Sequence, residues 1–442
     1  MKVFFIGIGG IGVSALARRY LARGWAVSGS DAASSEITQT LQKSGMRIFI
    51  KKSANLKTIA PDLVIYSLAV KNDHPELKQA LRLGVKTMSY PQALGELTKK
   101  YNTIAIAGAH GKSTTAAMIG IVLAAAKMDP SVIVGTKVKE FKNSNFRSGK
   151  SDLLVVEACE YARAFWNYHP QIAVVTNIEM DHIECYENEK QLMAAFEKFA
   201  GNLKKGGKLA VCADDANAKK LGEIMKNKGL EVLYYSLAMP EAKIMREILR
   251  VPGEHNIANA LAALMVARAL KIADEIIFKS LAKYRGSWRR FDCRWAKIGD
   301  KKITAVFDYG HHPTQIKLTM DAARAKWPKK RIICVFQPHQ AWRTHLLFDD
   351  FAKVFQNAPP DKTFITDIYQ VAGRENEKIA KNINSEKLVF EIGRDKVEYV
   401  PKKRIIVKLK REIKGGEVVL IMGAGDIYDL SKYLNKRAKK TQ

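Results

Sequence analysis

The stretch that decides the fold is Thr103-Ile-Ala-Ile-Ala-Gly108-Ala-His110-Gly111-Lys112-Ser113-Thr114-Thr115. Its apolar first half predicts a buried strand at Ile104–Ala107, and the run Gly111–Ala126 predicts a helix. The glycine turn between them lets backbone N–H groups surround phosphate oxygens at the positive end of the helix. In such a loop Lys112 reaches the β- and γ-phosphates, and Ser113 ligates magnesium. The spacing is that of a shortened GxxGKS loop; the alternative is an ordinary glycine turn with a surface lysine.

Two further strand ends carry groups that bind metals. Glu157 ends the predicted strand Leu153–Val156, and His182 follows the predicted strand Ile172–Thr176. Because the carboxyl ends of parallel strands lie along one edge of a sheet, both side chains are expected to converge on the phosphate loop. Carboxylate, hydroxyl and phosphate oxygens suit Mg²⁺. The sequence therefore predicts a magnesium site of Ser113, Glu157 and His182, with a structural role in a loop as the alternative for His182.

A second glycine-rich turn follows the predicted strand Val3–Ile6. Its members are Gly7, Gly9, Gly10 and Gly12, with the acidic Asp31 further along the chain. Together they match the dinucleotide-binding fingerprint, in which a diphosphate lies on a helix N-terminus. Alone, this pattern favours a nicotinamide-dependent oxidoreductase. The second phosphate loop at Gly108 instead favours a protein with two nucleotide ligands.

Strand-like and helix-like segments alternate along the whole chain, which predicts an α/β protein with parallel sheets. Further strands are expected at Leu63–Tyr66, Lys208–Cys212, Ile303–Phe307, Arg331–Phe336, Thr363–Thr366 and Val418–Met422, and further helices at Gly12–Arg23, Gln191–Ala200, Ile257–Ala269 and Pro313–Lys326. Three strand-to-helix glycine turns each begin a block. We expect three domains, at residues 1–98, 99–287 and 288–442.

Composition excludes several classes of protein. The 442 residues are 47% hydrophobic and 26% charged, as in a globular protein with sizeable cores, and contain no apolar run of membrane-spanning length. The glycines near the N-terminus argue against a signal peptide, and the five cysteines lack any paired spacing. We therefore expect a cytoplasmic protein without a structural zinc site.

The formal net charge is +29. Such a field attracts nucleotides or nucleic acid. The basic residues are spread along the chain without a recognised nucleic-acid reader motif, which favours a solvated cationic surface over a specific nucleic-acid partner. A non-catalytic nucleic-acid-binding protein is the alternative, but it leaves Lys112, Glu157 and His182 without a purpose.

In their order along nearly the whole chain, the motifs resemble those of the Mur ligase family, ATP-dependent amide-forming enzymes of peptidoglycan synthesis. The segments that carry the resemblance are GIGGIGVSALA (7–17), YSLAVKNDHPEL (66–77), GAHGKSTT (108–115), EACEY (157–161), TNIEMDH (176–182), PGEHNIANALAA (252–263), RRF (289–291), DYGHHPT (308–314), FQPHQAWRT (336–344) and MGAGDI (422–427). The resemblance implies a Rossmann-like UDP-binding domain, a central P-loop ATPase domain and a Rossmann-like C-terminal domain that closes over the site.

The resemblance also implies roles for the matching residues. The N-terminal glycines would hold the diphosphate of a UDP-sugar, with Asp31 and Ser67 as further substrate-binding residues. ATP and magnesium would be held by Gly108, His110, Gly111, Lys112, Ser113 and Thr114, with Glu157 and His182 completing the metal shell. His255, Asn256 and Asn259 match a segment near the adenine, where Asn256 is alternatively a helix cap. Arg290 would approach the ATP phosphates.

The C-terminal motifs would supply the rest of the reaction centre. Asp308, Tyr309, His311 and His312 would come from the closing domain, and His339 and Arg343 would contact the muramoyl or amino-acid carboxylate. The expected catalytic residues are Lys112, Asp308, His312 and Arg343. Asp308 or His312 would orient or deprotonate the attacking amine, and the sequence leaves the choice open.

This chain departs from the family pattern at several positions. Ala109 and Ser113 stand where the family usually has threonine, and Gln340 replaces a usual arginine. Phe196 aligns with the carboxylated lysine of ligases for later amino acids, and Lys198 lies two residues on; this favours the branch that adds L-alanine to UDP-N-acetylmuramate through an acyl phosphate. A ligase that attaches a whole tripeptide to the same sugar is the alternative. We expect a monomer or homodimer.

Overall fold

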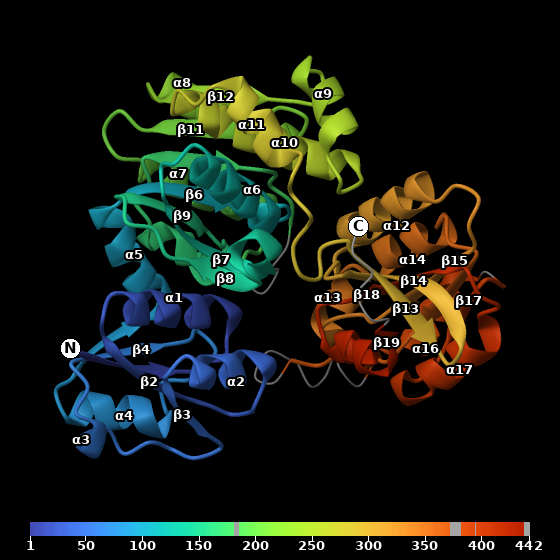
Figure 1. The fold of residues 1–442 in the computed structure, drawn as a ribbon, viewed down its shortest axis with the longest axis horizontal. Coiled ribbons are helices and arrows are strands. Elements are labelled where there is room, and N and C mark those ends of the chain that lie inside the picture. Colours follow the sequence, from blue (N-terminus) through green and yellow to red (C-terminus); the bar gives the residue numbers. More distant parts are fainter. Residues whose placement is uncertain (181–184, 372–381, 394, 437–442) are drawn as a thin grey trace. The chain divides into compact units, whose positions relative to one another are not determined.

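The computed structural model describes residues 1–180, 185–371, 382–393 and 395–436. They form two compact units. The first comprises Met1–Arg250 with Asn256–Arg285, and the second comprises Val251–His255 with the chain from Gly286 onward. Three sheets lie within these units (Figure 1). None of the described helices is long and apolar enough to cross a bilayer.

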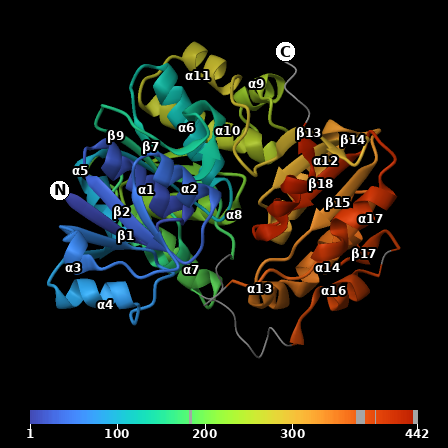
Figure 2. The ribbon, with the colours of Figure 1, turned by 60° about the horizontal axis from the view of Figure 1, so that its bottom comes forward.

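The first sheet is parallel throughout, in the order β3-β2-β1-β4-β5. Its elements are β1 (Lys2–Ile6), α1 (Ile11–Ala22), β2 (Ala26–Asp31), α2 (Glu36–Lys43), β3 (Arg47–Ile50), α3 (Leu56–Ile59), β4 (Leu63–Tyr66), α4 (Pro75–Arg82), β5 (Lys86–Ser89) and α5 (Tyr90–Lys100). Val3 and Phe5 pack with Leu16 of α1, whereas Phe4 packs with Leu77 of α4. Because alternate side chains of β1 point to opposite faces, helices cover both sides of this sheet. Figure 2 shows β1 and β2 side by side within it.

The central sheet has the order β12-β11-β10-β6-β9-β7-β8 and is parallel except for the antiparallel pair β7 and β8. Its strands are β6 (Asn102–Ala107), β7 (Ser131–Val138), β8 (Ser144–Arg147), β9 (Leu153–Glu157), β10 (Ile172–Val175), β11 (Lys208–Cys212) and β12 (Glu231–Tyr235). Its helices are α6 (Lys112–Ala125), η1 (Lys139–Phe141), η2 (Tyr161–Asn167), α7 (Glu189–Gly201), α8 (Ala216–Asn227), α9 (Glu241–Ile248), α10 (Glu254–Ala269) and α11 (Asp274–Leu281). The phosphate-loop strand β6 lies between β9 and β10, so the predicted site strands are direct neighbours.

The sheet of the second unit has the order β17-β16-β15-β18-β14-β13-β19, with β13 antiparallel to both of its neighbours. Its strands are β13 (Asp292–Ile298), β14 (Lys301–Asp308), β15 (Ile332–Phe336), β16 (Lys362–Ile365), β17 (Val397–Tyr399), β18 (Val418–Met422) and β19 (Asn435–Lys436). Its helices are α12 (Pro313–Lys326), α13 (Ala341–Leu346), α14 (Phe348–Gln356), α16 (Ser385–Ile392), η3 (Lys402–Arg404), α17 (Ile405–Glu412) and η4 (Asp426–Tyr433).

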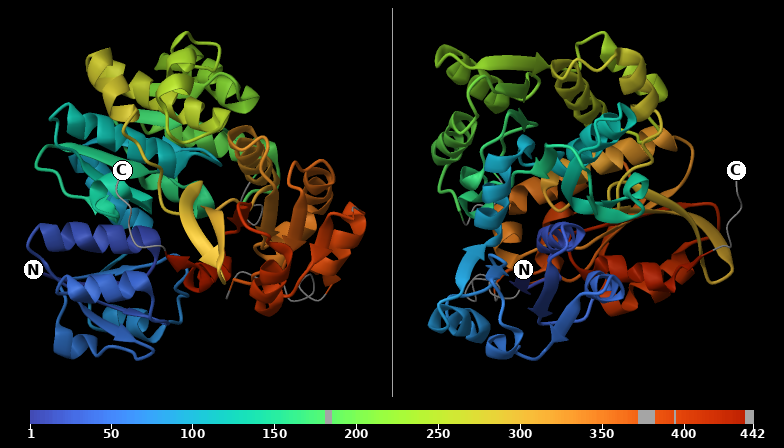
Figure 3. Two further views of the ribbon diagram at one scale, coloured as in Figure 1. Left: turned by 45° about the vertical axis from the view of Figure 1, so that its right-hand side comes forward. Right: turned by 60° about the vertical axis from the view of Figure 1, so that its left-hand side comes forward.

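Both faces of this sheet are covered. Cys334 and Phe336 of β15 pack with Phe351 of α14, and Val335 between them packs with Leu409 of α17. The views in Figure 3 show helices on either side of the strands. Because β14, β15, β16 and β18 are parallel, their carboxyl ends form one edge of the sheet, and the C-terminal motifs of the sequence lie there.

The predicted α/β class with parallel sheets is confirmed, and each predicted strand and helix is present with ends shifted by at most a few residues. The stretch between Tyr235 and Pro252 contains helix α9 and no strand. The domain limits at 98 and 287 remain predictions.

Candidate active site

The phosphate loop joins β6 to α6, and glycine is required at two of its positions. Gly108 has φ +129° and Gly111 has φ +84°, a backbone region that other residues rarely adopt. A methyl group built on Gly108 would collide with the Thr176 hydroxyl, and one on Gly111 would collide with the Asn259 amide. Asn259, from α10, also accepts a hydrogen bond from Thr115 at 3.1 Å. The predicted loop residues and Asn259 therefore lie together.

Lys112 bends back over the loop. Its ammonium group donates to the carbonyl oxygens of Gly108 and Ala109, the latter at 3.2 Å. It also forms an ion pair with the Glu160 carboxylate, with N–O distances of 3.1 and 3.2 Å. The side chain of Lys112 is 14% exposed and that of Glu160 is 3% exposed. Carbonyl and carboxylate oxygens thus accept the hydrogen bonds of the lysine ammonium group that nucleotide phosphates would require.

The end of β10 supports the loop from one side. The Asn177 side chain accepts from the backbone N–H of His110 at 2.8 Å and donates to the His110 carbonyl at 3.1 Å. The His110 ring lies 2.7 Å from the Glu179 carboxylate. Burial raises the pKa of the nearby Asp215 carboxyl, which accepts the N–H groups of Ala218 and Ile178. Backbone and side chain of His110 are therefore both held in place.

Glu157 stands beside the loop, as its strand position predicts. In the parallel pair of β6 and β9 it is the register partner of Ile106, close to the start of the loop. The Gly135 backbone N–H donates to its carboxylate, and a methyl group on Gly135 would lie 3.0 Å from that carboxylate. Ser113 is buried in the first turn of α6. Asp181 and His182 lie outside the described residues.

The described part of the predicted metal site fits a hard cation. A carboxylate on β9 and a hydroxyl at the start of α6 lie on the neighbouring strand and helix of one loop, and Mg²⁺ prefers such oxygen ligands. The role of His182 stays a prediction.

The N-terminal glycine loop shows a second set of close contacts. Gly7 has φ +79°, and a methyl group on it would lie 3.0 Å from Cβ of Ser67. The Gly9 N–H donates to the Asp31 carboxylate at 2.7 Å. Gly10 precedes α1 without any side-chain hydrogen bond to its N-terminus. The structure thus brings the predicted substrate residues together, with Asp31 holding the loop through Gly9.

This loop is also tied to the central sheet. The Asn145 amide from β8 donates to the Ile11 carbonyl at 2.6 Å and to the Ser14 hydroxyl at 2.8 Å. A methyl group on Gly12 would lie 2.7 Å from the hydroxyl oxygen of Tyr90. Burial raises the pKa of the Tyr90 phenol, and the Glu157 and Cys159 side chains raise it further. The N-terminal glycine loop is thus held by contacts from both sheets of the first unit.

In the second unit, Asp308 ends β14 and is buried. One carboxylate oxygen accepts from the Phe291 N–H at 2.8 Å and the other from the Gly310 N–H at 2.7 Å. Asp308 therefore fixes the turn that leads to the buried His312, which precedes α12.

His255 and Asn256 lie in the first turn of α10.

A cluster of aromatic and cationic groups lies at the same carboxyl edge. The His339 ring stacks on Tyr369 at 5.5 Å and contacts the His311 ring edge-on at 5.6 Å. The Arg343 guanidinium lies 3.2 Å from Nδ1 of His339. Gln340, at the position of the family's arginine, is buried with φ +68°, and its N–H donates to the Tyr369 carbonyl.

The two arginines of the RRF segment differ in environment. Arg289 is buried beneath aromatic rings and donates to the Gly423 and Gly425 carbonyls. Burial lowers the pKa of Arg289. Arg290, the residue predicted to approach ATP, is partly buried with its guanidinium 5.0 Å from the Tyr309 ring. Because the two arginines are adjacent in the sequence, the spacing of the motif could not show which of them is buried.

Several residues of the site were missed by sequence reasoning. They are Glu160, Glu179, Tyr90, Gly135 and Asn145. Glu160 and Glu179 lie within the quoted motifs EACEY and TNIEMDH. Their position in those motifs was a sequence signal that could have placed them near Lys112 and His110. Tyr90, Gly135 and Asn145 act through contacts between distant segments, and no local pattern marks them.

Comparison with known proteins matches the chain to three family models. These are "Mur ligase family, catalytic domain" at residues 2–102, "Mur ligase middle domain" at residues 106–250 and "Mur ligase, glutamate ligase domain" at residues 289–425. The chain is 38% identical to a UDP-N-acetylmuramate--L-alanine ligase of Clostridium tetani over 97% of its own length and 96% of the relative. It is 37% identical to the enzyme of the same name from Acetivibrio thermocellus, covering 98% of this chain and 95% of the relative.

Among solved structures, the UDP-N-acetylmuramate-alanine ligase of Thermotoga maritima superposes with a TM-score of 0.78 at 27% identity, covering 98% of this chain and 97% of that one. A murein peptide ligase of Psychrobacter arcticus, at 22% identity, shares the fold with a TM-score of 0.72 and covers 99% of this chain and 100% of that one.

Proposed function

The chain belongs to the Mur ligase family, and from this premise we propose that it joins L-alanine to UDP-N-acetylmuramate at the expense of ATP. The observation that carries the proposal is the phosphate loop of β6 and α6 with Glu157 beside it, in the same unit as a second glycine loop on α1. One loop suits ATP and the other the diphosphate of the UDP-sugar. The proposed setting is the cytoplasm, with the protein as a monomer or homodimer.

Amide formation from a carboxylate first needs activation of that carboxylate. In the proposed reaction the lactyl carboxylate of UDP-N-acetylmuramate attacks the γ-phosphate of ATP, giving an acyl phosphate and ADP. The attacking anion and the triphosphate repel each other, so positive charge and N–H dipoles must offset this repulsion. Lys112 and the loop N–H groups supply both, once the lysine leaves Glu160 for the phosphates.

Ser113 and Glu157 are proposed to hold Mg²⁺, with His182 as a third ligand. The bound cation would supply electrostatic stabilisation of the phosphate oxygens. The Gly135 N–H orients the Glu157 carboxylate, and Ser113 is buried in the first turn of α6. His110, Gly111, Thr114, Asn256, Asn259 and Arg290 are proposed to complete ATP binding.

In the second step, the amine of L-alanine attacks the acyl carbon and phosphate leaves from a tetrahedral intermediate. We assign His312 and Arg343 to this step, with His339 on the carboxylate side. Asp308 holds two backbone N–H groups, which favours a positioning role for it over proton removal. An acyl phosphate hydrolyses in water, so the reaction requires the site to be shielded during this step.

The test of the ATP site is Lys112→Ala. Because Lys112 acts on ATP phosphates and not on the α1 loop, the variant should release phosphate at least a hundredfold more slowly and keep its affinity for UDP-N-acetylmuramate. Loss of one such stabilising charge typically raises the barrier by about 3 kcal/mol. Phosphate release and calorimetric binding measure the two properties. Lys228→Ala, which removes an exposed lysine paired with Glu197, is the control and should change neither. Loss of both properties in Lys112→Ala would contradict separate sites.

A further inference from the structure

Tyr90 occupies a ligand-binding edge without a role in the proposed reaction. It directly follows β5 and begins α5. The carboxyl ends of β1 and β4, in the same parallel sheet, lead to Gly7 and Ser67. Ligands of open parallel sheets bind along this edge. Tyr90 therefore belongs to the same edge as the residues assigned to the UDP-sugar.

The phenol is packed against the glycine loop. A methyl group on Gly12 would lie 2.7 Å from the Tyr90 hydroxyl oxygen and 2.9 Å from Cζ of the ring, closer than side-chain carbons approach. Gly12 has no positive φ that would itself require glycine. The absence of a side chain at Gly12 thus serves to admit Tyr90 to the N-terminal turn of α1.

The backbone around Tyr90 is held firmly. Ser89 and Gln92 form a reciprocal capping box, with the Ser89 N–H donating to the Gln92 side chain at 2.8 Å and the Gln92 N–H to the Ser89 hydroxyl at 3.4 Å. Pro91 occupies the first turn of α5. Because these contacts fix the start of α5, the phenol is directed at Gly12 before any ligand arrives.

The hydroxyl has an unused donor. Within the described part of the chain it makes no hydrogen bond, and Gly10 leaves the N-terminus of α1 without a side-chain cap. Backbone N–H groups at a helix N-terminus attract an anion, and a phenol beside them adds a neutral donor to the same oxygen atoms.

We propose that the Tyr90 hydroxyl donates a hydrogen bond to the diphosphate of the UDP-sugar, and so fixes the substrate at the α1 loop. The inference rests on the proposed function for the identity of the substrate. A diphosphate is common to UDP and UDP-N-acetylmuramate, so both ligands should depend on Tyr90. ATP should not, because its phosphate loop is on α6.

The test compares Tyr90→Phe with Tyr20→Phe in the full-length protein. Tyr20 lies on α1 eight residues beyond Gly12, about 12 Å along the helix, and packs edge-on against Trp25. Calorimetry should show that Tyr90→Phe lowers the affinity for UDP and for UDP-N-acetylmuramate each by about tenfold or more, as expected when a hydrogen bond to a charged group is lost. ATP affinity and kcat should stay within about twofold, with the loss in KM for the UDP-sugar. Tyr20→Phe should change none of these values.

A double variant separates contact from packing. Gly12→Ala should displace the phenol and lower the affinity for UDP. Adding Tyr90→Phe should lower that affinity no further, because both changes remove the same interaction. Unchanged UDP affinity in Tyr90→Phe, an equal loss in Tyr20→Phe, or additive losses in the double variant would overturn the inference. A wild-type protein that binds UDP through Tyr90 but forms no amide would instead contradict the proposed function alone.

Discussion

The pairing of Lys112 with Glu160 determines how the phosphate loop behaves without nucleotide. Two carbonyl oxygens and a carboxylate with an exposed fraction of 3% surround the ammonium group. Removal of one partner of a buried ion pair leaves the other charge undercompensated. In the proposed reaction the ATP phosphates replace the carboxylate as acceptors, so the state of Glu160 and the affinity for ATP are expected to be coupled.

Glu160→Gln should therefore lower the thermal unfolding temperature of the nucleotide-free protein by a few degrees, corresponding to about 1–2 kcal/mol. A saturating non-hydrolysable ATP analogue should narrow the difference from wild type, because the phosphates then neutralise Lys112. Glu197→Gln, at the exposed pair with Lys228, should have little effect in either state. A difference that is equal with and without the analogue would show that Glu160 does not compete for the lysine.

Gly135 controls the direction of the Glu157 carboxylate. Alanine is allowed by its backbone, but the added methyl group would lie 3.0 and 3.1 Å from the two carboxylate oxygens. We expect Gly135→Ala to raise the Mg²⁺ concentration needed for half-maximal ADP release several-fold and to leave UDP affinity unchanged. Gly201→Ala is the matched control, since a methyl group there meets no atom within 4 Å. An unchanged Mg²⁺ requirement would remove Glu157 from the proposed metal site.

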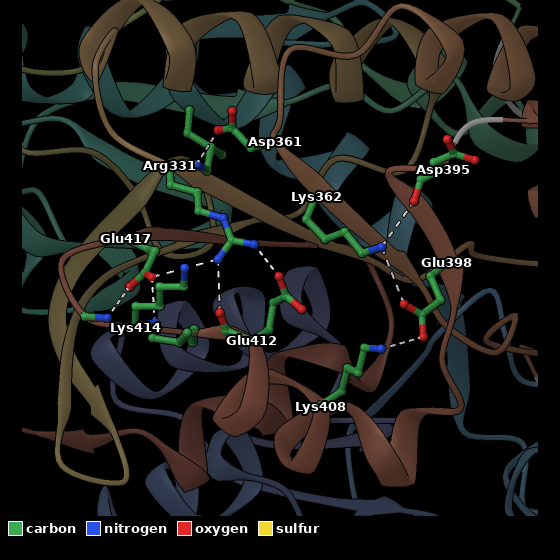
Figure 4. A network of polar contacts seen from close by, with 12 residues as sticks. Arg331, Asp361, Lys362, Asp395, Glu398, Lys408, Glu412, Lys414 and Glu417 are labelled. Carbon is green, nitrogen blue, oxygen red and sulfur yellow. Dashed lines mark hydrogen bonds and ion pairs between the residues drawn. The ribbon is translucent and has the colours of Figure 1, made fainter.

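At the scale of elements, the second unit has its predicted reaction-centre residues and a network of charged residues at opposite edges of its sheet. The amino ends of β15, β16 and β18 carry a network of charged residues (Figure 4), whereas Asp308 and His339 follow the carboxyl ends of β14 and β15. Arg331 pairs with Glu412 of α17 and donates to the Glu412 carbonyl at 3.0 Å. The network joins α17 to the start of three strands.

Glu417 is the buried member of this network. Its carboxylate accepts the N–H groups of Lys414 and Gly415, each at 2.7 Å. Burial alone would raise the pKa of the Glu417 carboxyl, but these backbone donors and the Arg331 guanidinium lower it below its ordinary value. Folding therefore favours the ionised form.

The sign of the resulting pH dependence follows from the lowered pKa. Above the ordinary glutamate pKa of about 4.3 the stabilisation is fully present, and it is lost as the pH falls through the lower folded-state pKa. Glu417→Gln should lower the unfolding temperature at pH 7, by on the order of 1 kcal/mol, and the gap to wild type should shrink below about pH 4. Glu398→Gln, at the more exposed pairs with Lys362 and Lys408, should show little gap at any pH. A gap for Glu417→Gln that is constant from pH 7 to 3 would contradict the assignment.

Most elements could be predicted from the sequence where strand, turn and helix coincide, as at Ile104–Ala107, Gly111 and α6. The antiparallel strands β8 and β13 were harder to predict, because exposed or half-buried residues flank or interrupt their buried ones, so hydrophobicity alone does not mark them. Residues that act across elements, such as Tyr90 and Gly135, depend on packing that a single chain pattern does not contain.

At the scale of the whole molecule, the sequence order of motifs maps onto three sheets. The phosphate loop and the N-terminal glycine loop lie in one compact unit, and Asp308, His312 and Arg343 lie in the other. The proposed reaction needs both sets, since the first activates the carboxylate and the second is assigned to the attacking amine. The net charge of +29 is compatible with anionic nucleotide substrates but does not identify them.

The most direct measurement of the central claim is ADP release by the full-length protein with ATP, Mg²⁺ and UDP-N-acetylmuramate. The amine substrates to compare are L-alanine, glycine, L-serine and a tripeptide that begins with L-alanine, as the alternative ligase would use. We predict that release requires the UDP-sugar together with an amino acid, that L-alanine gives the highest kcat/KM, and that mass spectrometry finds one alanyl amide per ADP. No ADP release with UDP-N-acetylmuramate and L-alanine, or a clear preference for the tripeptide, would contradict this account.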